Sequence, residues 1–152
     1  MTETATETAR PEYRKPLPKP TETDQPHWDG LKRHQVLVQK CDDCGSFLWY
    51  PRQMCSNCMS FALTWTEVDP TGTIYSLTTQ HHGTGSKFDA ELPYSVAVVE
   101  LDAHPDVKLV GPVNNVTPEE IHIGQRVRGT FLDATDDVTF LHFEPFDTEG
   151  DK

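Results

Sequence analysis

Long apolar runs and positive charge are both scarce in this sequence. No stretch of the 152 residues is apolar over the roughly 20 positions that a membrane-spanning helix needs, and the opening MTETATETAR is not a signal peptide. The sequence therefore predicts a cytoplasmic protein with no membrane partner. Lysine and arginine number 13 against 24 acidic residues, a formal net charge of −11. Because nucleic-acid binders neutralise phosphates with lysine and arginine, this balance argues against a nucleic-acid partner.

Motifs for nucleophilic catalysis are missing as well. The sequence has no Gly-x-Ser-x-Gly, no phosphate-binding loop, and no cysteine outside two pairs. His81 and His82 are candidates for a general base or for metal ligands, but no carboxylate stands at a spacing that would orient either ring. We therefore assign no catalytic residue to this chain.

The four cysteines form two Cys-x-x-Cys pairs, Cys41 with Cys44 and Cys55 with Cys58. Two intervening residues let both sulfurs of a pair face one point on a tight turn, and Gly45 can take the positive φ that such a turn needs. Two such turns supply the tetrahedral set of sulfurs that zinc accepts, and a closed set leaves no position for a substrate. We predict one structural zinc ion, with iron as the minor alternative. Disulfides are disfavoured in a reducing compartment, and tandem redox dithiols would be redundant.

The N-terminal part is expected to be a tail followed by a metal-binding ribbon. Residues 1–23 are rich in proline and charge, which predicts a disordered tail, either solvated or docked on a partner. Residues 24–68 are expected to form a short helix and a zinc ribbon. Trp28 on that helix packs either on the chain's own core or on another subunit. The ribbon strands are expected at 36–40, 46–50 and 61–68.

The C-terminal part, residues 69–146, has the pattern of a small barrel, and residues 147–152 are expected to be a second tail. Five apolar or alternating segments follow one another. The capping-box pattern TPEEI predicts a short helix of one or two turns at 117–121, between the third and fourth. This order is that of a five-stranded OB-fold barrel, so the fold class is mostly β. The barrel strands are expected at 72–82, 93–101, 107–113, 125–134 and 137–145.

Two features of the surface allow a binding role. The loop at 81–92, which holds Lys87, lies where OB-folds contact ligands, although a mobile surface loop is the simpler interpretation. A group of aromatic residues could stack on bases, or could pack between ribbon, barrel and another protein. These aromatic residues are Phe47, Trp49, Tyr50 and Trp65.

Several motifs together resemble a known family. They are LVQKCDDCG, the YPR at 50–52, CSNC, GTIYSLT, LPYSVAVVELD and IGQRVRG. In this order they resemble the rubredoxin-like zinc ribbon plus OB-fold proteins that accompany thiolase-like enzymes, and the resemblance covers residues 27–146. The chain departs from that family pattern in having Tyr50 where a second proline is common and no glycine directly after Cys58.

The resemblance implies a non-catalytic subunit in a hetero-oligomer with a thiolase-like protein, with acyl-CoA at or near the interface. Thiolase or acyltransferase chemistry and retro-aldol cleavage of a steroid or lipid side chain stay open. The family's metal ligands correspond to the four cysteines. Candidates for contact with CoA or the partner are Arg52, His81, His82, Lys87, Arg126 and Arg128. The alternative from a different class is a stand-alone OB-fold module for single-stranded nucleic acid.

Overall fold

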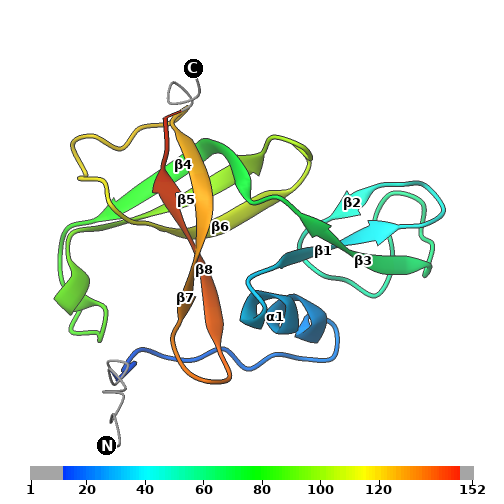
Figure 1. Cartoon of the computed structure of the whole chain (residues 1–152), viewed down its shortest axis with the longest axis horizontal. Helices are drawn as coiled ribbons and strands as arrows, with labels where there is room; N and C mark the ends of the chain where they lie inside the picture. Colours follow the sequence, from blue (N-terminus) through cyan, green and yellow to red (C-terminus); the bar gives the residue numbers. More distant parts are fainter. Residues whose placement is uncertain (1–11, 148–152) are drawn as a thin grey trace, which may run out of the picture.

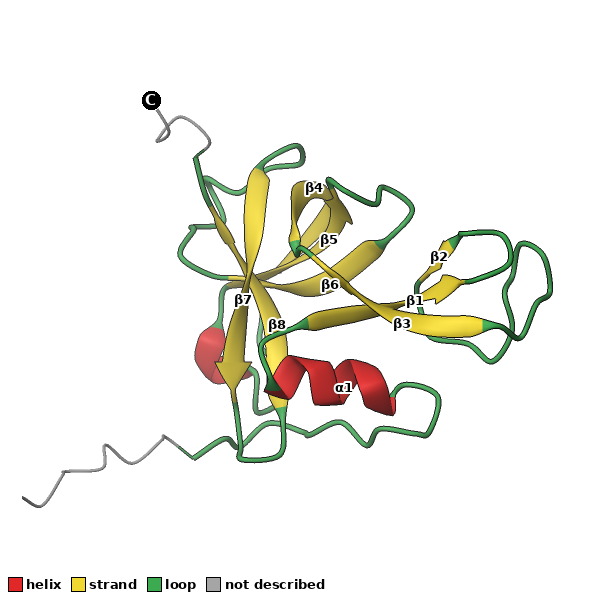
Figure 2. Cartoon of the chain, turned by 45° about the vertical axis from the view of Figure 1, so that its right-hand side comes forward, coloured by secondary structure: helices red, strands yellow, loops and turns green. Residues whose placement is uncertain are grey.

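A three-stranded sheet, one helix and a closed barrel make up the computed structural model, which describes residues 12–147 (Figures 1 and 2). The helix is α1 (Gln25–Lys32), and the sheet strands are β1 (Val36–Cys41), β2 (Phe47–Leu48) and β3 (Leu63–Val68). The barrel consists of β4 (Thr71–Gln80), β5 (Tyr94–Leu101), β6 (Lys108–Val113), β7 (Arg126–Asp133) and β8 (Thr139–Pro145). The mostly-β prediction, a ribbon followed by a five-stranded OB-fold barrel, is confirmed.

The strand order is β2-β1-β3 in the sheet and β4-β5-β6-β8-β7 in the barrel, where β4 and β7 pair to close the ring. All pairings are antiparallel except that of β6 with β8, which is parallel at Val113 and Phe143. Only Asp69 and Pro70 separate β3 from β4, so the chain passes directly from ribbon to barrel (Figure 2). Gly72 is required at this crossing, because a Cβ there would lie 2.1 Å from the carbonyl oxygen of Glu100.

Helix α1 packs against both β1 and β8 (Figure 1). Asp24 precedes the helix, and its carboxylate accepts hydrogen bonds from the Thr21 hydroxyl at 2.7 Å and from Trp28 Nε1 at 3.2 Å. Gly30, which weakens a helix in isolation, allows the close approach, since a Cβ at this position would lie 2.8 Å from Cγ of Leu37. Trp28 is half-buried and its ring meets Phe140 of β8 edge-on, so it packs on the chain's own core.

One apolar core joins the barrel to the base of the ribbon. In β5, which lies between β4 and β6, every second side chain from Ser95 to Leu101 is buried, while the others are only half-buried. This alternation is the period-2 pattern of a strand with its core face inward. The core residues are Leu31, Val36, Val38, Val68, Ile74, Ala97, Val99, Leu101, Val107, Leu109, Val113, Ile121, Val127 and Phe143.

One local prediction is confirmed at its lower limit, and one is wrong. Of the one or two helical turns expected at 117–121 there is a single turn, in which the amides of Glu120 and Ile121 both donate to the carbonyl of Thr117 at 3.0 Å. The Thr117 hydroxyl donates to the Glu120 carboxylate instead of capping the helix, and the buried Ile121 ends the turn in the core. The strand expected at 46–50 shrinks to the two residues of β2 because only Phe47 and Leu48 pair with β1.

The segment before α1 lies along the barrel. Residues 1–11 of the expected N-terminal tail, and 148–152 of the C-terminal one, lie outside the described residues. Residues 12–23 form no helix or strand, yet Lys15 makes an ion pair with Glu91 at 2.6 Å and Tyr13 contacts the ring of Phe140. Within residues 12–147, no helix has the length and apolar character that a membrane crossing requires.

Candidate metal centre and surfaces for ligand or partner

Two turns of the same construction present the four cysteines. In the first, the amide of Gly45 donates to the carbonyl of Cys41 at 2.9 Å; in the second, the amide of Met59 donates to the carbonyl of Cys55 at 3.0 Å. Gly45 and Met59 both have positive φ, +75° and +63°. Met59 therefore adopts the same kind of backbone conformation as Gly45, with the strain that a side chain brings in this region.

The four sulfurs converge on one point. Their Sγ atoms all lie within 4.8 Å of one another, with Cys41 and Cys58 3.5 Å apart and Cys44 and Cys55 3.7 Å apart. A zinc–sulfur bond of about 2.3 Å in a tetrahedron places the sulfurs about 3.8 Å apart. The cysteines are thus positioned to bind one metal ion, and the donor set fits zinc.

Polar neighbours support the thiolates. Asn57 donates its backbone amide to Cys55 Sγ at 3.4 Å and its side-chain amide to Cys44 Sγ at 3.6 Å. Contacts with Ser46, and then with Asn57, lower the pKa of the Cys44 thiol to about 5. A backbone hydrogen bond at Ser60 lowers the pKa of Cys58, but desolvation and the three neighbouring sulfurs outweigh it and raise that pKa to about 12, so Cys44 is the first of the two to become a thiolate. With all four protein ligands in place, the ion has no open position, so its contribution is to hold the two turns together.

Several large apolar side chains close in sequence to the second cysteine pair are exposed. Exposed fractions are 60% for Tyr50, 41% for Met54, 72% for Met59 and 76% for Phe61. All four belong to the segment that carries or adjoins the second cysteine turn. Exposed apolar side chains do not add to the solubility of a chain whose net charge is already −11. We therefore interpret their exposure as a contact surface for another molecule.

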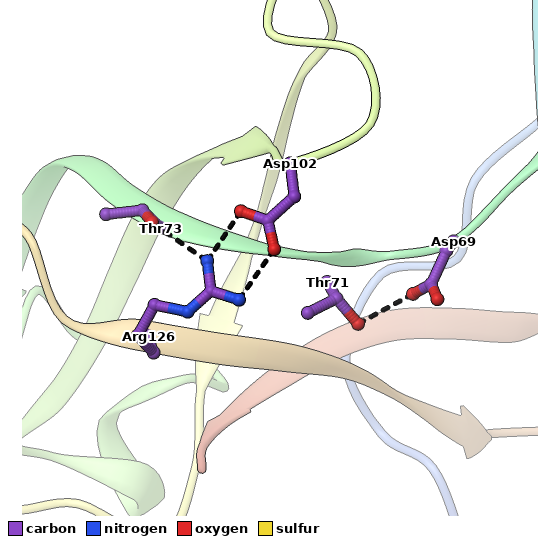
Figure 3. Close-up of polar contacts among 5 residues, drawn as sticks. All are labelled: Asp69, Thr71, Thr73, Asp102 and Arg126. Atoms are coloured by element: carbon purple, nitrogen blue, oxygen red, sulfur yellow. Dashed lines mark hydrogen bonds and ion pairs between the residues drawn. The ribbon is translucent and has the colours of Figure 1, made fainter. Parts of the chain in front are cut away.

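Two of the predicted contact residues are held by carboxylates. Arg126 of β7 donates to both oxygens of Asp102, at 2.5 and 2.6 Å, and to Thr73 Oγ1 at 3.3 Å (Figure 3). Arg128 makes an ion pair with Glu144 at 2.7 Å. The hydrogen bonds from Arg126 lower the pKa of Asp102. Because both guanidinium groups already have anionic partners, these two arginines are poor candidates for CoA phosphates.

The other predicted contact residues are exposed but do not form one site. Arg52 lies in the ribbon, where the side chain of Gln39 bonds its backbone amide and carbonyl at 2.7 and 2.8 Å. His81, His82 and Lys87 lie in the loop after β4, at the opposite side of the molecule from the ribbon (Figure 1). Their role in binding stays a prediction.

An aspartate orders the loop at 81–92. The carboxylate of Asp89 accepts hydrogen bonds from the amides of Thr84 at 3.1 Å and Gly85 at 2.8 Å, and these bonds lower its pKa. Within this loop, Asp89–Glu91 form the short 3-10 helix η1. Sequence reasoning missed this function of Asp89 because the glycines suggested mobility, although an Asp that bonds nearby amides is a known turn signal.

Comparison with protein families matches both parts of the chain. Residues 28–64 match the rubredoxin-like zinc ribbon domain of ChsH2, and residues 65–132 match the C-terminal OB-fold domain of ChsH2.

Two relatives are considerably longer than this chain. A probable enoyl-CoA hydratase alpha subunit of Thermomonospora curvata is 29% identical over 136 residues, which cover 90% of this chain and 41% of the relative. The 3-oxo-4,17-pregnadiene-20-carboxyl-CoA hydratase alpha subunit of Mycobacterium tuberculosis is 28% identical over 110 residues. The match covers 72% of this chain and 33% of the relative. The chain therefore spans about two fifths of the first relative and a third of the second.

Two solved structures are similar. One chain of the Ltp2-ChsH2(DUF35) aldolase has a TM-score of 0.77 and 29% identity, and the match covers 85% of this chain and 98% of that one. A DUF35 protein from Sulfolobus solfataricus has a TM-score of 0.56 at 18% identity, and the match covers 82% of this chain and 86% of that one. This similarity shows a shared fold.

Proposed function

Because this chain belongs to the family of ChsH2-type proteins, built from a rubredoxin-like zinc ribbon and an OB-fold domain, we propose that it is a non-catalytic accessory subunit. Its partner is a thiolase-superfamily enzyme acting on acyl-CoA thioesters. The observation that carries this proposal is the pairing of a closed four-cysteine centre with exposed apolar side chains close to it in sequence. Such a ribbon is built to hold a surface in place for a second protein.

The side chains of the described residues support a role without catalysis. No histidine among residues 12–147 is hydrogen-bonded to a serine, threonine or cysteine side chain; the partners found are Leu37, Asp133, Asn114 and Glu120. A nucleophile with its base is therefore not assembled in this part of the chain. The bond-breaking groups belong to the partner.

Retro-aldol cleavage of a steroid or lipid side-chain acyl-CoA is the favoured chemistry. The aldolase neighbour is similar over nearly all of its own chain, and one relative is named for a steroid acyl-CoA. Thiolase or acyltransferase chemistry is the runner-up. Because cysteines that hold a metal must stay reduced, we place the protein in the cytoplasm.

The surface of the OB-fold barrel is less suited to binding single-stranded nucleic acid. An OB-fold that binds such a strand needs free cations along an aromatic face. Here Arg126 and Arg128 are paired with carboxylates, and the net charge is −11. Acyl-CoA contacts fall instead to the exposed loop residues His81, His82 and Lys87, while Arg52, on the opposite side of the molecule (Figure 1), is a candidate for contact with the partner.

Reconstitution tests the proposal. The thiolase-like protein that co-purifies with the tagged chain is expressed separately, and acyl-CoA turnover is measured for each protein alone and for the mixture. We expect turnover only in the mixture. Full activity of the large subunit alone, or activity of this chain alone, contradicts the proposal.

The surface that binds the partner is tested with charged substitutions. Phe61→Glu and Met59→Glu are expected to weaken complex formation at least tenfold, because each places a charge in an apolar contact. Ile123→Glu is the matched control, since Ile123 is 65% exposed but lies in the barrel part of the chain. Equal loss in all three variants contradicts an interface on the ribbon.

A further inference from the structure

A groove of about 860 Å³ runs between the segment before α1 and the outside of the barrel. Tyr13, Lys15 and Pro16 form one side, and residues of β5, β6 and β8 form the floor. The loop at 81–92 reaches one end through Phe88 and Glu91. This volume lies within the range of about 300–1,000 Å³ that is usual for sites of small organic ligands. The groove is separate from the metal centre.

The groove is lined mainly by apolar and aromatic side chains. Val110 is 47% exposed and Leu132 is 38% exposed, although both belong to barrel strands. The rings of Tyr94 and Phe140 add flat apolar surface. Covering such surface stabilises a complex by about 25 cal/mol for each Å² removed from water, so an apolar ligand gains affinity here.

The charges that border the groove cancel each other. Lys15 Nζ lies 2.6 Å from Glu91 Oε1, and the lysine side chain is only 15% exposed. The same ammonium group lies 5.2 Å from the centre of the Tyr13 ring and 5.5 Å from that of Phe88. Because the Lys15 ammonium group already interacts with Glu91 and two aromatic rings, it has little capacity left to bind a phosphate group. The ligand is therefore uncharged where it meets the groove.

His142 contributes a hydrogen-bond donor to the lining of the groove. Asn114 Nδ2 donates to His142 Nδ1 at 2.9 Å, so the proton of the neutral ring is on Nε2. Burial, and then the nearby charge of Lys15, lower the pKa of His142 and keep the ring neutral. Nε2 has no partner among residues 12–147 and is not sealed from solvent, so it can donate to a ligand in the groove.

We propose that this groove binds the uncharged, apolar ring end of the acyl group, with His142 Nε2 donating to a ketone oxygen on it. The assignment rests on the proposed role as a subunit of an acyl-CoA enzyme. A rigid ring system suits the flat lining, because it covers much apolar surface and loses little conformational entropy on binding. The CoA end, which carries the phosphates, lies elsewhere.

Binding of progesterone, a four-ring ketone, to the zinc-loaded full chain without a partner tests the proposal. Titration followed by amide NMR is expected to show saturable shifts at groove residues such as Ser95, Val110 and Asn114, with no change at the cysteine turns. Free CoA is expected not to displace the steroid. Absence of binding up to the solubility limit, shifts confined to other surfaces, or displacement by CoA overturns the proposal.

Three variants localise the binding. Val110→Lys places a charge in the exposed floor and is expected to weaken progesterone binding at least tenfold. His142→Phe keeps a ring but removes the donor, and is expected to weaken it about fivefold. His142→Gln retains a donor and is expected to restore most of the affinity. Unchanged affinity in Val110→Lys, or equal affinity in both His142 variants, overturns the proposal.

This test and the reconstitution assay fail independently. The NMR titration contains no partner and measures no turnover, so a negative result removes the groove assignment and leaves the subunit role standing. A large subunit that is fully active alone removes the subunit role, whatever the titration shows.

Discussion

The ribbon and the barrel are held together by different means. The outer part of the ribbon has three buried side chains with hydrophobic character, Cys41, Leu48 and Cys55, and Leu63 packs against them. The barrel core contains buried aliphatic residues from β4, β5, β6 and β7, together with the fully buried Phe143 of β8. Burial of so few apolar side chains cannot offset the entropy that is lost when the backbone is ordered. The free energy of metal binding therefore has to stabilise the outer part of the ribbon.

The base of the ribbon and the barrel share one hydrophobic core, so they are expected to unfold together. Leu31, Val36, Val38 and Val68 are buried in the same cluster as the barrel residues, while the cysteine turns are not. We therefore propose that the two cooperative units meet within β1, between Val38 and Cys41, rather than at the sequence boundary expected at 68.

Removal of the metal is expected to unfold only the outer ribbon. Zinc contributes about 10–16 kcal/mol to the folding of isolated zinc-binding peptides. Chelation, or the Cys44→Ser substitution, should therefore collapse the amide NMR signals of residues 42–62 into the random-coil region. The signals of Val36, Val38 and the barrel should keep their dispersion. Ser56→Ala, in the same turn as Cys55 but with no metal ligand removed, is the control, and simultaneous loss of the barrel signals contradicts two separate units.

Truncation of a buried phenylalanine should affect the barrel most. Phe143→Ala removes a side chain with 0% exposure and is expected to cost about 3–5 kcal/mol of unfolding free energy. Phe61→Ala removes the same atoms from a ribbon side chain that is 76% exposed, and should change stability by no more than about 0.5 kcal/mol. Urea unfolding followed by circular dichroism measures both, and similar values would refute the contrast.

The ion pair at the barrel end should make a small contribution that depends on pH. Arg126 lowers the folded-state pKa of Asp102, so the stabilisation is present above the unfolded-state pKa of about 3.9 and is lost as the pH falls through the lower folded value. Asp102→Asn should cost about 0.5–1 kcal/mol at pH 7, because both side chains are partly exposed. This difference from the parent chain should vanish in acid. Asp106→Asn, at an exposed residue with no ion pair among residues 12–147, is the matched control.

The sequence was most informative where covalent spacing determines geometry. Two Cys-x-x-Cys pairs predicted a metal site correctly because the intervening residues leave the backbone few conformations. The alternation of apolar residues predicted the barrel strands for a similar reason, since one face of each strand must be buried.

Contacts between distant segments could not be predicted in this way. The salt bridge between Lys15 and Glu91 joins a proline-rich segment to a loop 76 positions later, and neither has apolar periodicity. The pairing of Arg126 with Asp102 depends on which strands become neighbours in the barrel. The capping pattern predicted one or two turns at 117–121, and the turn stops after one because Ile121 is buried in the core.

In the proposed complex, a metal-held ribbon, rather than the barrel, holds the second protein that performs the chemistry. Sedimentation of the co-purified thiolase-like subunit with zinc-loaded parent chain and with Cys44→Ser chain tests it directly. We expect a hetero-oligomer with the parent chain and separate species with Cys44→Ser, although its barrel stays folded. A complex of undiminished affinity with the Cys44→Ser chain would contradict the account.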